Sequence, residues 1–199
     1  NEETLMDDPL ARSCGRAVMG CSVSIKDADG TELARGEVGE VVVSGTNIMA
    51  GYWNKPEQTA AVLKHGGYYT GDMGYLDDDG YLFLVDRSKD MIVSGGENVY
   101  STEVEEVLYR HPAVLEAAVF GVPDDKWGEA VYAVIVPRPE NAEVQPEELI
   151  AFCREHIGGY KVPKGIDIQH EPLPKSGPGK VLKRELRAPY WEGTDRAVN

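Results

Sequence analysis

Residues 80–105 read GYLFLVDRSKDMIVSGGENVYSTEVE, and the organisation of the whole chain follows from this stretch. Its first part, residues 81–85, is an apolar run typical of a strand, and residues 86–90 are mostly charged. A second apolar run, the pair Gly95-Gly96 and a Thr-x-x-Glu capping box at Thr102 follow, so a helix is predicted to begin there. A strand that stops in a charged segment and restarts indicates a domain junction, and a hairpin with a polar turn fits the spacing equally well.

The sequence before this junction is rich in strand signals, and the sequence after it alternates between strand and helix patterns. We therefore predict the α+β fold class, with a β-rich, barrel-like subdomain at residues 1–86 and a small α+β C-terminal cap domain at residues 87–199. No helix or strand is expected within residues 1–12. The predicted strands cover residues 15–25, 39–43, 81–85, 91–93, 114–121, 131–136 and 166–169, with one more just before a turn at 77–80. The predicted helices cover residues 54–63, 102–111, 146–157 and 183–188.

The composition is that of a soluble globular protein of 199 residues, with 42% hydrophobic and 27% charged residues. A formal net charge of −14 makes the chain poorly suited to bind nucleic acid, and no apolar run is long enough for a membrane span. The cysteines Cys14, Cys21 and Cys153 are too few and too scattered for a disulfide framework or a zinc site. We therefore expect no metal site in this chain, and free thiols in a reducing, cytoplasmic environment.

A basic segment near the C-terminus holds the second strong pattern. Residues 161–187 contain seven basic and three acidic side chains, which suits a phosphate-bearing ligand as well as a solvated surface. Within it, residues 173–184 read LPKSGPGKVLKR, where Lys180 follows a segment rich in Gly and Pro. Such a segment can carry an ammonium into a cleft, where it opposes negative charge developing on phosphate and carboxylate oxygens. Taken alone, a flexible surface lysine is the better interpretation, and Val181 rules out a Walker loop.

These patterns together resemble signatures of the adenylate-forming superfamily, which contains acyl-CoA synthetases, peptide-synthetase adenylation domains and beetle luciferases. The similar stretches are Thr70-Gly71-Asp72, the run from Arg-x-Lys-Asp at Arg87 through Gly-Gly-Glu-Asn-Val to Glu-Val-Glu, and Pro-Lys-x-x-x-Gly-Lys-Val at residues 174–181. The resemblance covers essentially the whole chain but only the back part of the family's architecture. We therefore expect a fragment that is inactive alone, with the phosphate-gripping loop and most of the acid pocket upstream.

The resemblance implies roles in ATP binding for three residues. Lys180 corresponds to the catalytic lysine that contacts the acyl carboxylate and the α-phosphate during adenylation. Asp72 corresponds to an aspartate that accepts hydrogen bonds from the ribose hydroxyls, which suits an acceptor-only carboxylate. Arg87 corresponds to a position that contacts the ribose or phosphate of the adenylate. Without the resemblance, Gly71-Asp72 would be interpreted as a turn.

The resemblance also implies a hinge and a CoA site. Lys89 corresponds to the hinge about which the small domain turns, from the orientation that makes the acyl-adenylate to one that admits pantetheine past Gly95 and Gly96. Two adjacent glycines suit that passage, and a tight turn explains them equally well. The positions that bind the CoA nucleotide in some ligases match Trp127, Tyr160 and Lys164. Packing on the sheet edge is an equal alternative for Trp127, and Val162 departs from relatives that carry a basic residue there.

The resulting hypothesis is the C-terminal portion of an ATP-dependent acyl-CoA synthetase, which converts a carboxylic acid, ATP and CoA into acyl-CoA, AMP and pyrophosphate through an acyl-adenylate. ATP, CoA and Mg²⁺ would be its cofactors, with the magnesium ligands outside this chain. Its partners would be a small-molecule carboxylic acid, as in fatty acid metabolism or an aromatic acid, and the upstream part of the same protein. A homo-oligomer is compatible with the sequence. The alternatives are an adenylating enzyme that loads a carrier protein, and a non-catalytic module that keeps the fold.

Overall fold

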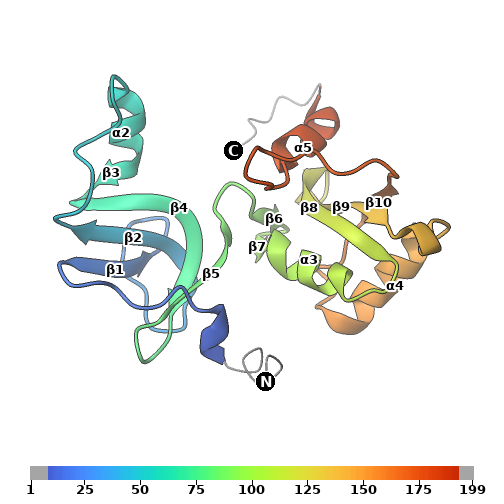
Figure 1. Ribbon diagram of the computed structural model, residues 1–199, viewed down its shortest axis with the longest axis horizontal. Coiled ribbons are helices and arrows are strands. Elements are labelled where there is room, and N and C mark those ends of the chain that lie inside the picture. Colours follow the sequence, from blue (N-terminus) through green and yellow to red (C-terminus); the bar gives the residue numbers. More distant parts are fainter. Residues whose placement is uncertain (1–8, 193–199) are drawn as a thin grey trace. The chain divides into compact units, whose positions relative to one another are not determined.

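The computed structural model describes residues 9–192, and the chain divides into two compact units between Ser88 and Lys89 (Figure 1). This division lies two residues after the predicted boundary between residues 86 and 87. A short 3₁₀-helix, η1 (Pro9–Arg12), lies where the sequence predicts neither helix nor strand, and residues 1–8 of that segment lie outside the described residues. Each unit has its own sheet and its own hydrophobic core.

The first unit is built on a five-stranded antiparallel sheet that curls around its longest strand (Figure 1). That strand, β4 (Gly67–Leu76), pairs along one edge with β2 (Gly39–Gly45), whose other edge carries β1 (Cys21–Lys26). The opposite edge of β4 carries β3 (Leu63–Lys64) at one end and β5 (Leu82–Arg87) at the other. Register shifts interrupt the β2–β4 and β4–β5 pairings, and such bulges bend and twist the strands that contain them.

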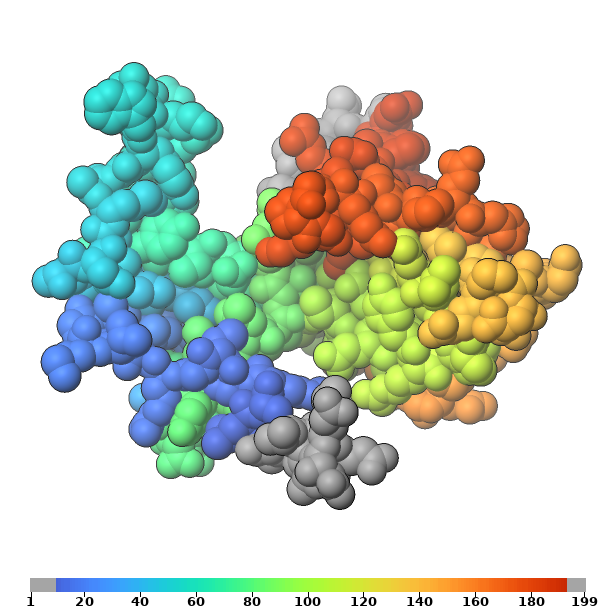
Figure 2. Space-filling model, viewed as in Figure 1, coloured from blue at the N-terminus to red at the C-terminus, as the bar shows by residue number. Residues whose placement is uncertain are grey.

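The hydrophobic core of the first unit is small. Ile25, Val41 and Leu76 are buried on one face of the curled sheet, with partly buried neighbours such as Leu82 packed against them. The helix α2 (Pro56–Val62) adds no buried side chain to this core. Figure 2 shows its segment in cyan, projecting from the sheet of this unit.

The second unit contains a mixed five-stranded sheet with β9 at its centre. β8 (Val114–Asp124) pairs with one edge of β9 (Gly128–Pro137) along its whole length. The other edge of β9 pairs with β10 (Gly165–Ile168), which is parallel to it, and at Gly128 with β6 (Ile92–Ser94). β7 (Glu97–Val99) extends the sheet beyond β6. The chain segments that lead into β6 and β10 therefore share one edge of the central strand.

Three helices enclose this sheet (Figure 1): α3 (Ser101–Tyr109), α4 (Pro146–His156) and α5 (Lys183–Trp191). Alternate residues of β8 face opposite sides, because successive side chains of a strand point to opposite faces. Val119 packs with the α3 and α4 core around Leu149, and Phe120 packs with Tyr190 of α5 on the other face. β8 and β9 are thus buried on both faces, as the apolar run at residues 131–136 predicts. A short 3₁₀-helix, η2 (Pro139–Asn141), connects β9 to α4.

Two local predictions near the junction are wrong. β5 does not stop before the charged residues but runs through Asp86 to Arg87, because Arg87 is paired in register with Asp72 of β4. α3 begins at Ser101, and no side chain caps it. The predicted cap at Thr102 lies one residue inside the observed helix, and the Glu105 Oε1 atom accepts a hydrogen bond from the Val119 backbone N–H of β8 at 2.8 Å.

The predicted fold class holds, but the strand predicted at residues 15–25 begins only at Cys21, and the short strands β3 and β7 were not predicted. A curled, β-rich first unit is followed by a second unit of helices packed on a sheet, which confirms the predicted α+β class. The three cysteines are free, and burial of Cys153 raises the pKa of its thiol to about 11. Within residues 9–192, no helix is both long enough and apolar enough to cross a lipid bilayer.

Candidate functional site

Asp72 and Arg87 lie opposite one another on neighbouring strands of the first unit. The Arg87 Nε atom is 3.4 Å from the Asp72 Oδ1 atom, and the two side chains are 49% and 36% exposed, respectively. A half-exposed ion pair contributes only about 0–1 kcal/mol to stability, because water screens it. The pair therefore leaves a carboxylate that can accept hydrogen bonds from hydroxyls and a guanidinium that can donate to anionic oxygens.

The backbone beneath Asp72 is held by a local hydrogen-bond network. The Thr70 hydroxyl donates to the Val41 carbonyl at 2.8 Å and accepts from the Asp72 N–H at 3.1 Å. Gly71, at a φ of +75°, donates its N–H to the Glu40 carboxylate at 3.0 Å. A side chain at this φ would be strained, which explains the glycine. Thr70-Gly71-Asp72 thus lies within β4, whereas the residues taken alone would be interpreted as a turn.

Lys180 lies on a short hairpin of the second unit, which comprises residues 175–181. Lys175 and Val181 form its antiparallel bridge, and the Ser176 N–H donates to the Lys180 carbonyl at 2.8 Å. Gly179 closes the turn with a φ of +86°. Within residues 9–192, the exposed ammonium of Lys180 has no hydrogen-bond or ion-pair partner. The hairpin therefore presents a cation that a ligand can reach, on the C-terminal segment drawn in orange and red in Figure 2.

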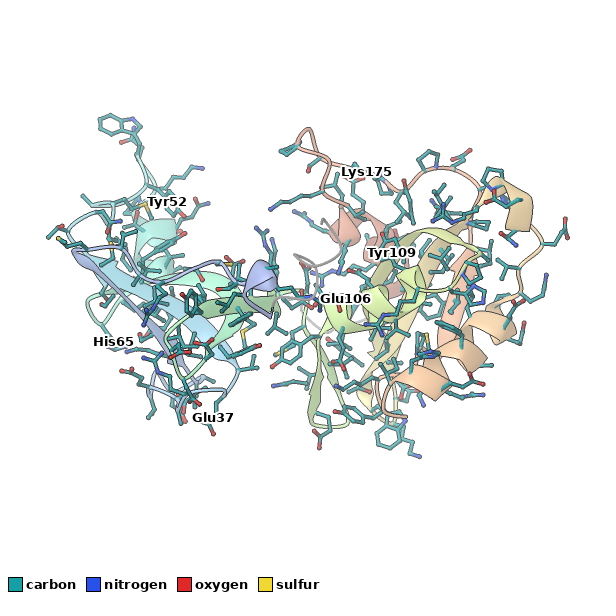
Figure 3. The ribbon with its side chains drawn as sticks, turned by 60° about the horizontal axis from the view of Figure 1, so that its bottom comes forward. Glu37, Tyr52, His65, Glu106, Tyr109 and Lys175 are labelled. Carbon is teal, nitrogen blue, oxygen red and sulfur yellow. The ribbon has the colours of Figure 1, made fainter. Side chains whose placement is uncertain are left out.

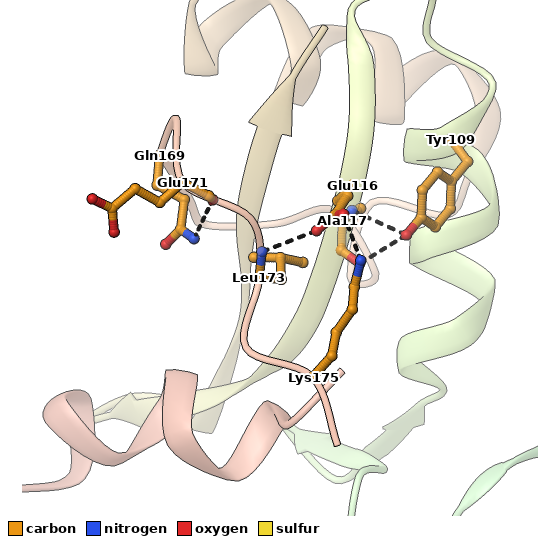
Figure 4. Close-up of polar contacts among 7 residues, drawn as sticks. All are labelled: Tyr109, Glu116, Ala117, Gln169, Glu171, Leu173 and Lys175. Carbon is orange, nitrogen blue, oxygen red and sulfur yellow. Dashed lines mark hydrogen bonds and ion pairs between the residues drawn. The ribbon is translucent and has the colours of Figure 1, made fainter. Parts of the chain in front are cut away.

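One strand of the hairpin is anchored to β8 through Glu116 (Figure 4). The Lys175 ammonium donates to Glu116 Oε1 at 2.6 Å, and the Leu173 N–H donates to Glu116 Oε2 at 2.9 Å. The hydrogen bond from Lys175 is the main cause that lowers the pKa of Glu116, and the bond from Leu173 acts in the same direction against the effect of burial. Glu116 is thus held as a carboxylate that fixes the base of the hairpin.

Gly95 and Trp127 are in direct contact. The Gly95 N–H donates to the Trp127 carbonyl at 2.8 Å, and a Cβ atom added to Gly95 would lie 2.6 Å from the indole ring. Gly96 has a φ of +88° and open space around it. Trp127 packs on this glycine loop and still exposes 41% of its surface, with the Lys126 ammonium 4.5 Å from its ring centroid. The packing interpretation of Trp127 therefore holds, and an accessible aromatic surface remains beside the glycines.

Lys164 lies on the same edge of β9 as the glycine loop. Its N–H donates to the Val131 carbonyl at 2.8 Å, three residues along β9 from Gly128, which pairs with Ser94. At about 3.4 Å per strand residue, this separation is about 10 Å. The exposed side chains of Tyr160, Lys164 and Trp127 thus belong to segments that meet one edge of the central strand.

Two residues between Tyr160 and Lys164 make contacts within the second unit. The Lys161 ammonium contacts both carboxylate oxygens of Glu103 at 2.7 Å. Burial of Lys161 is the largest single effect and opposes its charge, but the hydrogen bond to Glu103, the charge of Glu103 and the neighbouring Tyr160 together outweigh it, so the pKa of Lys161 is raised. Val162 is only 4% exposed and belongs to the core beneath α3 and α4. The position is therefore apolar because it is buried, and it has no phosphate-binding role.

Lys89 begins the second unit, and its backbone is tied to the C-terminal helix. The Arg187 guanidinium of α5 donates to the Lys89 carbonyl at 3.2 Å, while the Lys89 residue itself is exposed. The backbone at the start of the second unit is thus tied to α5 of the same unit.

Two models of the AMP-binding enzyme family match separate parts of the sequence. The model "AMP-binding enzyme" matches residues 2–53, and the model "AMP-binding enzyme C-terminal domain" matches residues 103–180. The chain is 48% identical over 165 residues to a feruloyl-CoA synthase of Amycolatopsis sp., which covers 83% of this chain and 33% of that protein. This chain belongs to the AMP-binding, or adenylate-forming, superfamily.

Further relatives are similar to this adenylate-forming chain in sequence or in structure. It is 43% identical over 198 residues to the medium/long-chain-fatty-acid–CoA ligase FadD8 of Mycobacterium tuberculosis, covering 96% of this chain and 34% of that protein. Its fold matches the crystal structure of ATP-bound MatB from Rhodopseudomonas palustris with a TM-score of 0.84 and 35% identity, over 91% of this chain and 36% of that one. The chain spans about a third of the length of these relatives.

The structure distributes the predicted site residues of this adenylate-forming chain over both units. Asp72 and Arg87 come together in the first unit, and Lys180, Gly95 and Trp127 lie in the second with the remaining CoA candidates. Among residues 9–192, no group of three His, Cys, Asp or Glu side chains is placed to hold a metal ion. The described residues therefore do not fit a complete magnesium site.

Sequence reasoning missed a cluster beside the hairpin. The Lys183 ammonium lies 2.6 Å from the Ser101 hydroxyl and 2.7 Å from the Glu105 Oε1 atom. The side chains of Lys183 and Glu105 are 14% and 15% exposed, respectively. Ser101 is fully buried. The only signal in the sequence is the spacing of three residues between Lys180 and Lys183, which does not indicate that Lys183 reaches α3.

Proposed function

We propose that this chain is the C-terminal part of an ATP-dependent acyl-CoA synthetase. The carboxylate of an acid attacks the α-phosphorus of ATP, pyrophosphate leaves, and an acyl-adenylate forms. The CoA thiol then attacks the acyl carbonyl carbon, AMP leaves, and the thioester forms. The observation that carries this proposal is the accessible Lys180 on its hairpin, at the residue where the match to the C-terminal domain model ends.

Each candidate residue has a physical task in the first step. The Lys180 ammonium would oppose the negative charge that grows on the α-phosphate oxygens, and losing one such contact typically raises the barrier by about 3–4 kcal/mol. The Asp72 carboxylate would accept hydrogen bonds from the ribose hydroxyls. The Arg87 guanidinium, beside it on β5, would donate to the ribose or phosphate oxygens. The geometry of β4 and β5 supports this assignment because it keeps both groups accessible.

The second step requires the thiol arm of CoA to reach the adenylate. We assign this passage to the loop at Gly95 and Gly96, with Trp127, Tyr160 and Lys164 available to the nucleotide part of CoA. Rotation at Lys89 would exchange the adenylating orientation for the thioester-forming one. The two-unit division of the chain next to this residue supports such a hinge. Mg²⁺ would neutralise the phosphates in the first step, held by ligands outside this chain.

The names of the relatives bear on the acid and the acceptor. A feruloyl-CoA synthase and a fatty-acid–CoA ligase are both similar to this chain at more than 40% identity. We therefore propose CoA as the acceptor and an aromatic or fatty acid as the substrate, with the enzyme in the cytoplasm. Loading of a carrier protein is the rival acceptor, since the same two steps would apply to its pantetheine thiol.

The full-length protein that contains this chain tests the proposal directly. We expect ATP–pyrophosphate exchange that depends on an aliphatic or aromatic acid, and acyl-CoA formation with free CoA at a rate well above that with a phosphopantetheinylated carrier. The chain of 199 residues alone should release no pyrophosphate. Acid-independent ATP turnover by the full-length protein, or none at all across an acid panel, would contradict the proposal.

A further inference from the structure

Two other lysines lie at the base of the hairpin that presents Lys180, Lys175 as its first residue and Lys183 just after it, and both form ion pairs. Lys175 on one side contacts Glu116 of β8, and Lys183 on the other contacts Glu105 of α3, at 2.6 and 2.7 Å. The two pairs differ in burial. The Lys175 side chain is 41% exposed, whereas Lys183 and its partner are 14% and 15% exposed. Because water screens exposed pairs, the Lys183 pair is the stronger restraint on the hairpin.

The partner of Lys183 is itself fixed by the sheet. β8 pairs only with β9 among the described strands, so its other edge needs partners from elsewhere. Side chains of α3 supply them. The Tyr109 hydroxyl accepts from the Ala117 N–H at 3.1 Å, and Glu105 Oε1 accepts from the Val119 N–H at 2.8 Å (Figure 4 shows the first). The carboxylate that holds Lys183 is therefore anchored to the backbone of β8 at Val119, which is fully buried.

Lys183 is also the first residue of α5, two residues after the end of the hairpin at Val181. The Leu182 N–H donates to the Pro174 carbonyl at 2.8 Å, so the two ends of the hairpin are joined just before Lys183. A shift of Lys183 would therefore move the hairpin that carries Lys180. A displacement of about 1 Å at a reacting group can lower a rate about 100-fold.

We propose that Lys183 is a positioning residue, which sets the place of the Lys180 ammonium during adenylation through its contacts with Ser101 and Glu105. This inference rests on the proposed function, because it requires that Lys180 takes part in forming the acyl-adenylate. It requires no contact between Lys183 and substrate. Its role is specific to the first step, because the thiol step uses the glycine loop and not the hairpin.

Half-reactions of the full-length protein separate this role from general stabilisation. We expect Lys183→Met to lower the rate of acid-dependent ATP–pyrophosphate exchange about 30-fold with little change in the KM for ATP, as a misplaced group would. Thioester formation from preformed acyl-adenylate should change less than about 3-fold. Lys183→Arg keeps the charge and should recover adenylation to within about 5-fold of wild type. Arg184→Met, at the exposed neighbouring position, should stay within about 2-fold in both half-reactions.

A double variant and an independent readout guard against misfolding. Glu105→Gln with Lys183→Met removes both charges, so no carboxylate is left unpaired in the core, and it should show the same loss of adenylation. Hydrogen exchange should be faster than in wild type at the Ser176, Gly179 and Leu182 amides and unchanged in β9. If the variants adenylate normally, or lose both half-reactions equally with faster exchange throughout the unit, the proposal is wrong. If the wild-type full-length protein adenylates no acid, the proposed function is wrong. In that case the positioning role of Lys183 is still tested, because unchanged hydrogen exchange of the hairpin amides in Lys183→Met would contradict it.

Discussion

The two units present their candidate residues in different ways. Asp72 and Arg87 stand on paired strands, where backbone hydrogen bonds and the network around Thr70 fix them. Lys180 stands on a hairpin whose place depends on side-chain ion pairs with β8 and α3. Groups on strands are held more rigidly than groups on loops. In the proposed function, the nucleotide-binding residues of the first unit therefore stand on a fixed element, and the reacting lysine of the second unit stands on an adjustable one. Figure 3 labels Lys175, which lies at the base of this hairpin.

The largest expected effect is at the adjustable group. Lys180→Ala in the full-length protein should lower adenylation about 10²–10³-fold, because one charge contact to the transition state is lost. Thioester formation from preformed acyl-adenylate should be almost unchanged, and so should the melting temperature, since the side chain is exposed. Pyrophosphate exchange and single-turnover thioester assays measure the two steps. Arg154→Ala, at an exposed position of α4, is the matched control, and an equal loss in both steps would refute the assigned role.

A smaller effect is expected at the fixed element. Asp72→Ala should weaken ATP binding by about 1.5–3 kcal/mol, or roughly 10–150-fold, because charge-assisted hydrogen bonds to the ribose are lost. The free energy of unfolding should fall by less than about 1 kcal/mol, because the pair with Arg87 is half exposed. Titration calorimetry with the full-length protein measures the affinity. Asp78→Asn in the neighbouring turn is the control, and unaltered ATP affinity in Asp72→Ala would show that the carboxylate does not bind the nucleotide.

The glycine loop tests how closely the second unit is packed. Gly95→Ala should reduce the free energy of unfolding by about 1–3 kcal/mol more than Gly96→Ala does, because the new methyl group would overlap the Trp127 ring. Both substitutions also carry backbone strain at positive φ, so Gly96→Ala is the matched control. Urea unfolding of the chain, followed by tryptophan fluorescence, gives the difference. Equal stability of the two variants would mean that Trp127 moves aside without cost.

The smallest effect concerns the base of the hairpin. The pKa of Glu116 is lowered in the folded state, so the carboxylate stabilises the fold above the ordinary glutamate pKa, and this contribution is lost as pH falls through the folded pKa. Glu116→Gln should therefore be less stable than wild type by about 1 kcal/mol near pH 7, and the difference should vanish in acid. Melting temperatures between pH 7 and pH 3 measure it. A difference that grows toward low pH would have the wrong sign for this pair.

The candidate residues were predictable where they lie in contiguous motifs. Asp72, Arg87 and Lys180 stand in short signatures with fixed spacing, so a resemblance between sequences was enough to single them out as candidates. Lys183 and Val162 could not be assigned in this way. Their surroundings come from α3 and the central sheet, tens of residues away in sequence. The contacts of Glu105 with β8 and Lys183 could not be predicted for the same reason, because the local pattern assigned this glutamate only to a capping box.

The order of the longer strands and helices, the apolar character of β8 and β9, and the motif positions were determined by the sequence alone, because each depends on residues close together in the chain. The short strands β3 and β7 were not predicted. The tertiary structure decided which charged side chains form ion pairs within the second unit and which remain accessible to a ligand. Lys161, Lys175 and Lys183 are paired with glutamates, while Lys180 extends from the same basic segment without a partner among the described residues. The physical reason is that an ion pair needs a partner at about 3 Å, and folding brings most of those partners from distant segments.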